Sequence, residues 1–396
     1  MRRNQGHVRQ RSEGTWELRY SLGTDLATGK RRTVTTTVEA KNQKAAENEL
    51  RRLLRTVDTN EHVDPSRLTV RQWLSTWLAA VEAEVAPKSH ERYSEIVEGF
   101  LVPELGNLLL SKLAPANIQG AYTKWSTEGR KDGKPGGLSP RTRRHIHRIL
   151  SSALARAVEQ QMIARNPADA FRKRLPKVER HEMATLTPDQ SATLLEGLRH
   201  TRIYWPSLVA LSTGMRRGEI LALRWKNVDL ERGTVRVVES LEETKAKGLR
   251  FKSPKTEKAR AIALPRFAVD ELRRLKKEQA ENLLRLGVRQ TGETLTCARA
   301  DGDPLHPRSL THEFTRLVRR VTDVPPVRFH DLRHSHATQL LLAGVHPKVA
   351  QERLGHSTIT TTLDLYSHVS ENMQEDAALR LDATFRPAIS RASGSK

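Results

Sequence analysis

The chain has 396 residues, with 68 Lys or Arg against 46 Asp or Glu, so its formal charge is +22. This length exceeds one ordinary domain core, and two or three domains are expected. A positive excess of this size favours a polyanionic partner, because Lys and Arg that neutralise phosphates release condensed counterions. Charge alone leaves open the alternative of a basic surface on a protein with another role.

The single cysteine, Cys297, excludes an intramolecular disulfide and a Cys-rich zinc site. The N-terminus is polar and Arg-rich, and the sequence contains no apolar run of ~20 residues. We therefore expect no membrane partner and a cytoplasmic protein.

Residues 1–60 show the pattern of a small β-sheet with one helix. Alternating polar and apolar residues predict strands over 15–20 and 32–38, and helical spacing of apolar residues predicts a helix over 41–57. The apolar residues of this helix are Ala45, Leu50, Leu53 and Leu54. A small sheet with basic side chains suits a groove of DNA, and a poorly ordered extension is the alternative.

Residues 68–170 predict an all-α domain. Thr69 and Gln72 form a capping box ahead of a helix whose apolar face runs to Val81. Two further helices are predicted over 87–100 and 115–126, and a fourth begins at Ser139-Pro140 with an N-cap and a proline at N1.

The first turns of this fourth helix carry four arginines: Arg141, Arg143, Arg144 and Arg148. Basic residues in a first turn are unfavourable beside the positive end of the helix dipole. A phosphate partner would compensate for this, so we predict that these arginines bind DNA.

Residues 171–185 are charged, lack apolar periodicity and are predicted to be a linker. A capped helix start at Thr187 opens a mixed, mainly α domain with a small β-sheet over 186–385. Residues 386–396 are predicted to be a flexible tail. Residues 371–385 form an amphipathic stretch, with Met373, Ala377, Ala378 and Leu381 as its apolar members.

Arg216 and Glu219 are three residues apart, in a segment that begins with the turn residue Gly214. This spacing places both on one face of a helix. A guanidinium oriented by a carboxylate suits two phosphate oxygens, although a purely structural ion pair would give the same pattern.

His330 and Arg333 are also three apart and predicted to be neighbours on a helix. The alternative chemistry is zinc binding, because His330 and His334 have the spacing of a zinc helix. Asp331 does not occupy the position of the glutamate in such a helix, and Arg333 would repel a cation, which argues against the metal.

His356 lies between two predicted helices, and Tyr366 follows it by ten residues. A lone tyrosine in such a run is usually part of a core. Here two arginines, two histidines and a tyrosine fall within one predicted folded unit, which favours a functional role for the tyrosine over a place in a core.

From about residue 68 to 370, the chain resembles the tyrosine recombinases, or phage integrases. The resemblance rests on four ordered motifs: Thr-Gly-Met-Arg at Arg216, His-Asp-Leu-Arg-His at His330 and Arg333, Leu-Gly-His-Ser at His356 and Tyr-Ser-His-Val at Tyr366. The family also has a catalytic lysine on a hairpin turn, and Lys255 stands in that place before the strand-like 261–264. Lys245, Lys247, Lys252 and Lys258 are its neighbouring rivals.

The resemblance implies that Tyr366 attacks a scissile phosphate, forms a 3'-phosphotyrosyl link and releases a 5'-hydroxyl. Arg216, Arg333 and His356 would stabilise the developing charge. Lys255 would act as general acid, His330 would help to deprotonate the tyrosine, and Glu219 would orient the site. Rejoining would need no ATP and no metal, because the ester retains the bond energy and the cations do the electrostatic work.

The resemblance also implies an arm-type DNA-binding domain (1–60), a SAM-like core-binding domain (68–170) and a catalytic domain (186–385). The expected partners are double-stranded DNA with core and arm-type sites, a homo-tetramer in the synaptic complex, an excision factor and a DNA-bending protein. A type IB topoisomerase and a non-catalytic DNA-binding regulator are the alternative functions.

Overall fold

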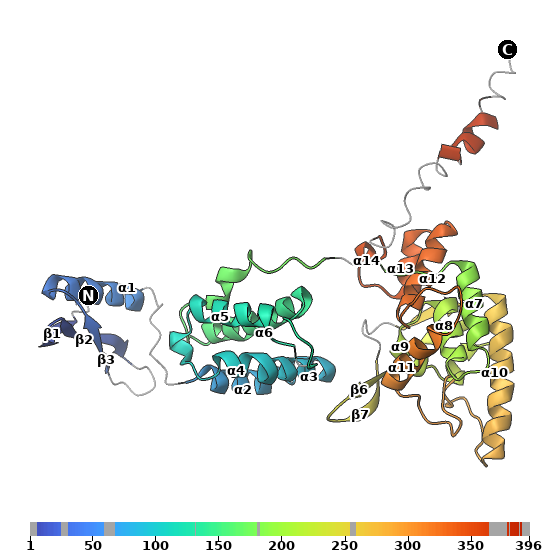
Figure 1. Cartoon of the computed structure of the whole chain (residues 1–396), viewed down its shortest axis with the longest axis horizontal. Helices are drawn as coiled ribbons and strands as arrows, with labels where there is room; N and C mark the ends of the chain where they lie inside the picture. Colours follow the sequence, from blue (N-terminus) through green and yellow to red (C-terminus); the bar gives the residue numbers. More distant parts are fainter. Residues whose placement is uncertain are drawn as a thin grey trace. The chain divides into compact units, whose positions relative to one another are not determined.

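The computed structural model describes residues 6–24, 31–58, 68–130, 132–179, 183–253 and 259–363, and then 378–379, 381–387 and 389. The chain divides into two compact units, Met1–Glu179 and Arg180–Lys396. It is a mixed α and β structure, mainly helical, with small sheets (Figure 1). Within the described ranges, no helix is long and apolar enough to cross a membrane.

The first unit opens with an antiparallel sheet of three strands and one helix, as expected (Figure 1). Strand alternation buries Trp16, Leu18 and Tyr20 on one face of the sheet, and the helix packs there through Ala46 and Leu50. Ala45, which we assigned to the apolar face, is exposed instead. The elements are β1 (His7–Ser12), β2 (Thr15–Thr24), β3 (Arg31–Glu39) and α1 (Gln43–Asp58).

The rest of this unit is helical and has its own apolar core. The Thr69–Gln72 capping box and the Ser139 N-cap are confirmed. The helix expected to end near Phe100 instead passes through a π-helical turn and continues to Leu105. The elements are α2 (Val70–Val81), α3 (Pro87–Ile96), the π turn η1 (Val97–Leu101), α4 (Val102–Leu105), η2 (Leu110–Lys112), α5 (Pro115–Thr127), α6 (Pro140–Glu159) and η3 (Pro167–Phe171).

The expected linker is shorter than 171–185. Phe171 is buried in the helical core, 5% exposed, and contacts the ring of Tyr122 at 5.2 Å between centroids. At the other end, the backbone N–H of Leu186 donates to Oγ of Ser335 at 2.9 Å. Phe171, the first residue of the expected linker, is therefore part of the helical core, and Leu186, the expected first residue of the next domain, is held by that domain.

In the second unit, α8 is the central buried helix. Other helices and two small antiparallel sheets, β4-β5-β8 and the hairpin β6-β7, make up the rest of this unit (Figure 1). α8 is buried on all sides, and its hydroxyl side chains bond to carbonyls of the preceding turn. The elements are α7 (Pro188–Leu198), α8 (Tyr204–Thr213), α9 (Arg217–Leu221), η4 (Trp225–Asn227), β4 (Val228–Asp229), β5 (Thr234–Val237), β6 (Ser240–Thr244), β7 (Gly248–Lys252), β8 (Arg260–Ala263), α10 (Arg266–Arg285), α11 (Pro307–Val318), α12 (Asp331–Leu342), α13 (Pro347–Leu354) and α14 (Ile359–Leu363).

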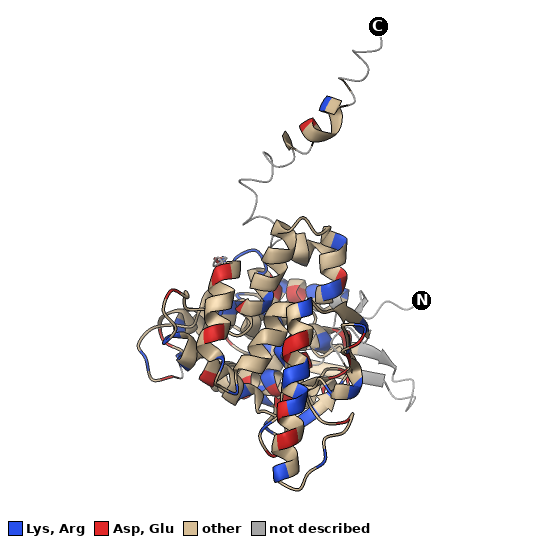
Figure 2. Ribbon diagram, turned by 90° about the vertical axis from the view of Figure 1, so that its right-hand side faces the viewer, with Lys and Arg blue, Asp and Glu red and all other residues tan. Residues whose placement is uncertain are grey.

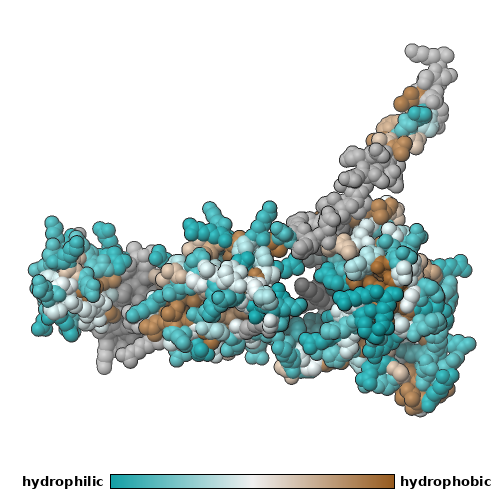
Figure 3. All heavy atoms as spheres, viewed as in Figure 1, coloured by the Kyte–Doolittle hydropathy of each residue, from teal (hydrophilic) through white to brown (hydrophobic). Residues whose placement is uncertain are grey.

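The visible surface is polar and of mixed charge. In the view of Figure 2, acidic and basic residues are interleaved along the helices of the second unit that face the viewer. Figure 3 shows hydrophilic residues covering most of the visible face, with hydrophobic residues in small separate patches. Along the helices that face the viewer in Figure 2, the basic residues therefore do not form one continuous block.

Candidate active site

Arg216 lies on the turn between α8 and α9, where it is the N-cap residue of α9. We had expected it inside the helix. The C-cap of α8 is Gly214, whose φ of 67° is left-handed and whose added Cβ would lie 2.6 Å from Cδ2 of His336. A glycine is therefore required for the turn that presents Arg216. The guanidinium donates from Nη1 to Glu219 at 3.0 Å and from Nη2 to the carbonyl oxygen of Gly355 at 2.8 Å.

Arg333 lies in the first turn of α12 and is 4% exposed. It donates from Nη1 to the carbonyl of Gly214 at 2.6 Å and from Nη2 to the carbonyl of Leu354 at 2.7 Å. Burial lowers the pKa of Arg333 to about 9, and the nearby charge of Arg216 acts in the same direction. A desolvated guanidinium beside a second cation favours an anionic partner, because the incoming negative charge offsets part of that cost.

His330 is the N-cap residue of α12, directly before the helix that carries Arg333, and the backbone N–H of Arg333 donates to the His330 carbonyl at 3.2 Å. His330 is exposed, yet desolvation by its neighbours and the charge of Arg333 lower its pKa. His334 packs edge-on against it, with 5.0 Å between ring centroids, and burial lowers the pKa of His334 to about 4. Both rings are therefore neutral near pH 7. In the described part of the chain, no group of three or more His, Cys, Asp or Glu is placed to hold a metal ion.

His356 follows Gly355, the left-handed C-cap of α13. Its Nδ1 lies 2.9 Å from Oγ1 of Thr362, which is fully buried. Burial, and then the charges of Arg333 and Arg216, lower the pKa of His356 to about 4. When the Thr362 hydroxyl donates to Nδ1, the proton of the neutral ring is on Nε2, which can then donate to a phosphate oxygen.

Glu219 is nearly completely buried, and two arginines bind it. Besides Arg216, the guanidinium of Arg260 donates to both carboxylate oxygens, at 3.1 and 2.6 Å. Burial acts to raise the pKa of Glu219, but the hydrogen bond and charge of Arg260, followed by those of Arg216, lower it overall. We did not single out Arg260 from the sequence, where its one signal was its place directly before the strand-like 261–264.

Two predicted catalytic residues, Lys255 and Tyr366, lie outside the described residues. Of the rival lysines, Lys252 forms an ion pair with Glu242, and Lys258 lies outside the described residues. In the amphipathic stretch at 371–385, Met373 and Ala377 also lie outside them, whereas 378–379 and 381–387 are helical.

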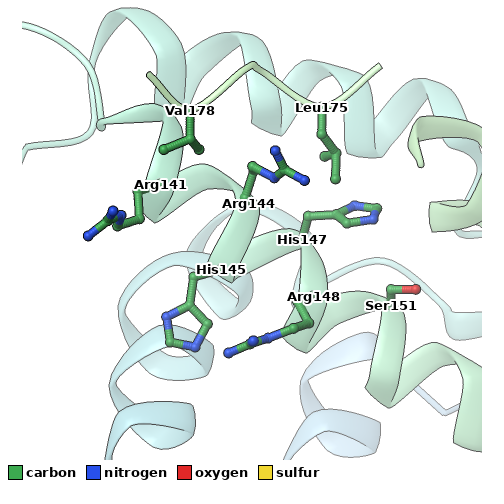
Figure 4. A pocket seen from close by; sticks show the side chains of 8 residues that line it. All are labelled: Arg141, Arg144, His145, His147, Arg148, Ser151, Leu175 and Val178. Atoms are coloured by element: carbon green, nitrogen blue, oxygen red, sulfur yellow. The ribbon is translucent and has the colours of Figure 1, made fainter. Parts of the chain in front are cut away.

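Three of the four predicted DNA-binding arginines lie together on α6. Arg141, Arg144 and Arg148 line a hollow of ≈ 570 Å³, together with His145, His147, Ser151 and two apolar residues from the segment after η3 (Figure 4). Arg143 does not line it: this residue is half-buried, and its Nε is buried without a hydrogen-bond partner among the described residues. The helical rotation between positions 143 and 144 separates them.

Comparison with known proteins assigns both units. Residues 184–373 match the phage integrase family, and residues 69–126 match the phage integrase N-terminal SAM-like domain. The chain is 28% identical over 382 residues to the ICEBs1 integrase of Bacillus subtilis, covering 95% of this chain and 99% of that protein. It is 26% identical over 323 residues to the integrase of Mycobacterium phage L5, covering 79% and 78% of the two chains.

Two solved structures have the same fold. The Tn1549 transposon integrase in complex with a circular intermediate DNA matches with a TM-score of 0.65 and 23% identity, over 79% of this chain and 99% of that one. A lambda integrase tetramer bound to a Holliday junction matches with a TM-score of 0.56 and 18% identity, over 90% and 94%. The chain belongs to the phage integrase family and is a tyrosine-type site-specific recombinase.

Proposed function

We propose that this recombinase integrates and excises a mobile DNA element by cleaving and rejoining strands through a 3'-phosphotyrosyl intermediate on Tyr366. The observation that carries the proposal is the convergence of Arg216, Arg333 and His356. The two arginines bond to the carbonyls of Gly355 and Leu354, the two residues directly before His356. Three groups able to donate to one phosphate are thereby held at the same end of α13.

In this mechanism the tyrosine oxygen attacks the scissile phosphorus, and the bond from phosphorus to the 5'-oxygen breaks. The phosphotyrosyl ester keeps the bond energy of the phosphodiester, so a 5'-hydroxyl reverses the step without ATP. Arg216 and Arg333 stabilise the charge on the non-bridging oxygens, and the Nε2 of His356 donates to one of them. We assign no metal to this reaction, because the cations take over that electrostatic role.

Two protons have to move. We assign Lys255 as the general acid that protonates the leaving 5'-oxygen, and His330 as the group that helps to deprotonate Tyr366. The lowered pKa of His330 supports its assignment, because a neutral imidazole near pH 7 can accept a proton. Glu219 acts as an orienter of Arg216 and carries no proton.

We assign residues 1–60 to the binding of arm-type DNA sites and the helical domain that begins at residue 68 and includes Phe171 to the binding of core sites. Residues 172–185 form the interdomain linker, residues 186–385 the catalytic domain and residues 386–396 a tail. The outer face of the N-terminal sheet is polar, as a DNA groove requires. Its cross-strand pairs are His7–Arg19, Arg9–Glu17, Arg19–Thr35 and Glu17–Thr37. On α6, Arg141, Arg144 and Arg148 supply phosphate contacts.

The assembly we propose is a homo-tetramer that holds core and arm-type sites, with an excision factor and a DNA-bending protein as accessory partners. The tetrameric state of lambda integrase on a Holliday junction, in a protein of the same fold, supports this arrangement. In this assembly the protein acts in the cytoplasm of a bacterial host, associated with the nucleoid.

The test is cleavage of a library of nicked suicide substrates, with the covalent adduct detected on a denaturing gel and the cleaved 5'-ends sequenced. We expect an adduct from the wild type and none from Tyr366→Phe. Tyr93→Phe is the matched control, because Tyr93 stacks on Trp77 in the helical domain and should keep full adduct yield. Equal yields from wild type and Tyr366→Phe would contradict the mechanism.

A further inference from the structure

Arg260, the first residue of β8, uses all three guanidinium nitrogens within the second unit. Nη1 and Nη2 donate to the two oxygens of Glu219, and Nε donates to the carbonyl of Arg353 at 3.0 Å. The side chain is 10% exposed and that of Glu219 is 1% exposed. A two-point bond between buried ions fixes orientation as well as distance.

The end of α13 is held by three arginines from three different elements. The consecutive carbonyls of residues 353, 354 and 355 accept hydrogen bonds from Arg260, Arg333 and Arg216, respectively. Carbonyls in the last turn of a helix lack intrahelical donors and carry its negative partial charge, so cations are favourable there. Residue 356, the next in the chain, is the histidine of the site.

Gly355 leaves the space that Arg260 occupies. A Cβ at this position would lie 3.0 Å from Nη1 and 3.1 Å from Cζ of Arg260, and the φ of 65° already favours glycine. The helix end and the guanidinium are therefore closely packed. A displacement of Arg260 would break its hydrogen bond to the carbonyl of Arg353, in the last turn of α13 before His356.

Glu219 transmits the position of Arg260 to Arg216. Its Oε1 accepts from both guanidinium groups, and its Oε2 accepts from Arg260 and from the backbone N–H of Arg216. Without Arg260, the carboxylate would keep one arginine partner in a buried place. Its pKa would then rise, because burial would no longer be offset by the stronger of its two partners.

We propose that Arg260 is a positioning residue of the recombination reaction, which aligns Arg216 through Glu219 and His356 through the end of α13. Arg260 thereby connects two parts of the active site, the α8–α9 turn that carries Arg216 and the end of α13 that precedes His356. This inference rests on the proposed function of the site.

The test compares Arg260→Gln with wild type in single-turnover cleavage of the mapped core site, with DNA binding and thermal unfolding measured in parallel. Arg236→Gln is the matched control, because Arg236 is an exposed arginine on the neighbouring strand β5, paired in register with Ala261. We expect Arg260→Gln to lower the cleavage rate on the order of 100-fold with core-site affinity retained. Arg236→Gln should cleave like the wild type.

Two further readouts separate positioning from a general loss of structure. The charged groups that face Glu219 are Arg216 on the α8–α9 turn, Arg260 on β8 and Arg333 on α12. Because loss of Arg260 frees the carboxyl to take up a proton, cleavage by Arg260→Gln should fall more steeply than that of the wild type as the pH is lowered below neutral. Adding Glu219→Gln should remove this extra dependence and cost little further activity, since both changes break the same connection.

If Arg260→Gln does not fold, Arg260→Lys is the second variant for the same cleavage assay. Lysine keeps the charge but cannot bond to both carboxylate oxygens and the Arg353 carbonyl in the same geometry, so an intermediate cleavage rate is expected. Wild-type cleavage rates in folded Arg260→Gln or Arg260→Lys would overturn the inference, as would parallel loss of cleavage and DNA binding in both. A wild-type protein that forms no Tyr366-dependent adduct would instead refute the proposed function.

Discussion

Arg216 and Gly355, 139 positions apart in the chain, are joined by a hydrogen bond of 2.8 Å from the guanidinium to the carbonyl oxygen. This bond makes the orientation of the arginine depend on how α13 ends. The same helix end binds Arg333 through the carbonyl of Leu354. Substitutions on either side of this connection should therefore affect cleavage together.

Arg216→Lys should lower single-turnover cleavage of the core site by about 100-fold or more, with little effect on core-site binding. Lysine lacks the planar fork that bonds to Glu219 and Gly355 while still presenting N–H groups to a phosphate. Arg217→Lys is the control, because the Arg217 side chain points to Thr311 on α11. Equal rate losses in the two variants would refute a specific role for Arg216.

Gly355→Ala should reduce both stability and cleavage. The left-handed backbone alone costs about 1–2 kcal/mol for a residue with a Cβ, and the new atom would also press on Arg260. Gly287→Ala separates the two effects, because Gly287 has a φ of 73° and nothing within 4 Å of its added Cβ. In urea unfolding and cleavage assays, both variants should be destabilised, and Gly355→Ala alone should lose cleavage. Unchanged cleavage in Gly355→Ala would argue against the tight packing of α13 on Arg260.

His336 should make the second unit less stable at acidic pH. Burial, together with the charge of Arg353, lowers its pKa to about 4. Its Nδ1 bonds to the carbonyl of Leu211, so Nε2 is the unprotonated nitrogen that accepts from Arg353. The unfolded chain, with a histidine pKa of ~6.5, binds more protons than the folded chain. The neutral His336 ring therefore contributes its full stabilisation above pH ~6.5, and this stabilisation is lost as the pH falls toward about 4.

Urea unfolding of the full chain at several pH values, followed by tryptophan fluorescence, measures this dependence. His336→Gln should be less stable than the wild type at neutral pH and lose less on acidification. His312→Gln, an exposed position on α11, should keep the slope of the wild type. A wild-type slope in His336→Gln would assign the acid sensitivity to other groups.

The arginines on α6 should differ in their contribution to DNA binding. Replacing Arg141, Arg144 or Arg148 by Gln should weaken binding of the core site and reduce the slope of log Kd against log salt by ~0.9 per lost phosphate contact. Arg143→Gln should leave that slope unchanged, because Arg143 does not line the hollow on this helix. Fluorescence anisotropy over a salt series tests both expectations, and a reduced slope for Arg143→Gln would show that the DNA contacts extend beyond the hollow.

Local patterns predicted most of the helices well. The capping boxes at Thr69 and Thr187 and the Ser139 N-cap start helices where expected, because these bonds join residues only three positions apart. Periodicity was less reliable where one residue decides the face, as with Ala45. It also missed the π turn at Val97–Leu101, where α3 continues into α4.

The sequence by itself was sufficient to recognise the family and to predict Arg216, His330, Arg333 and His356 as catalytic residues. This is because each family motif is a short, local run of the chain. Only the tertiary structure decided how they are held. Arg260 meets Glu219 across 41 positions, and the N-cap places of Arg216 and His330 take both outside the helices on which spacing had placed them. Such contacts depend on how α9, β8 and α13 pack, and packing brings together residues whose separation along the chain carries no signal.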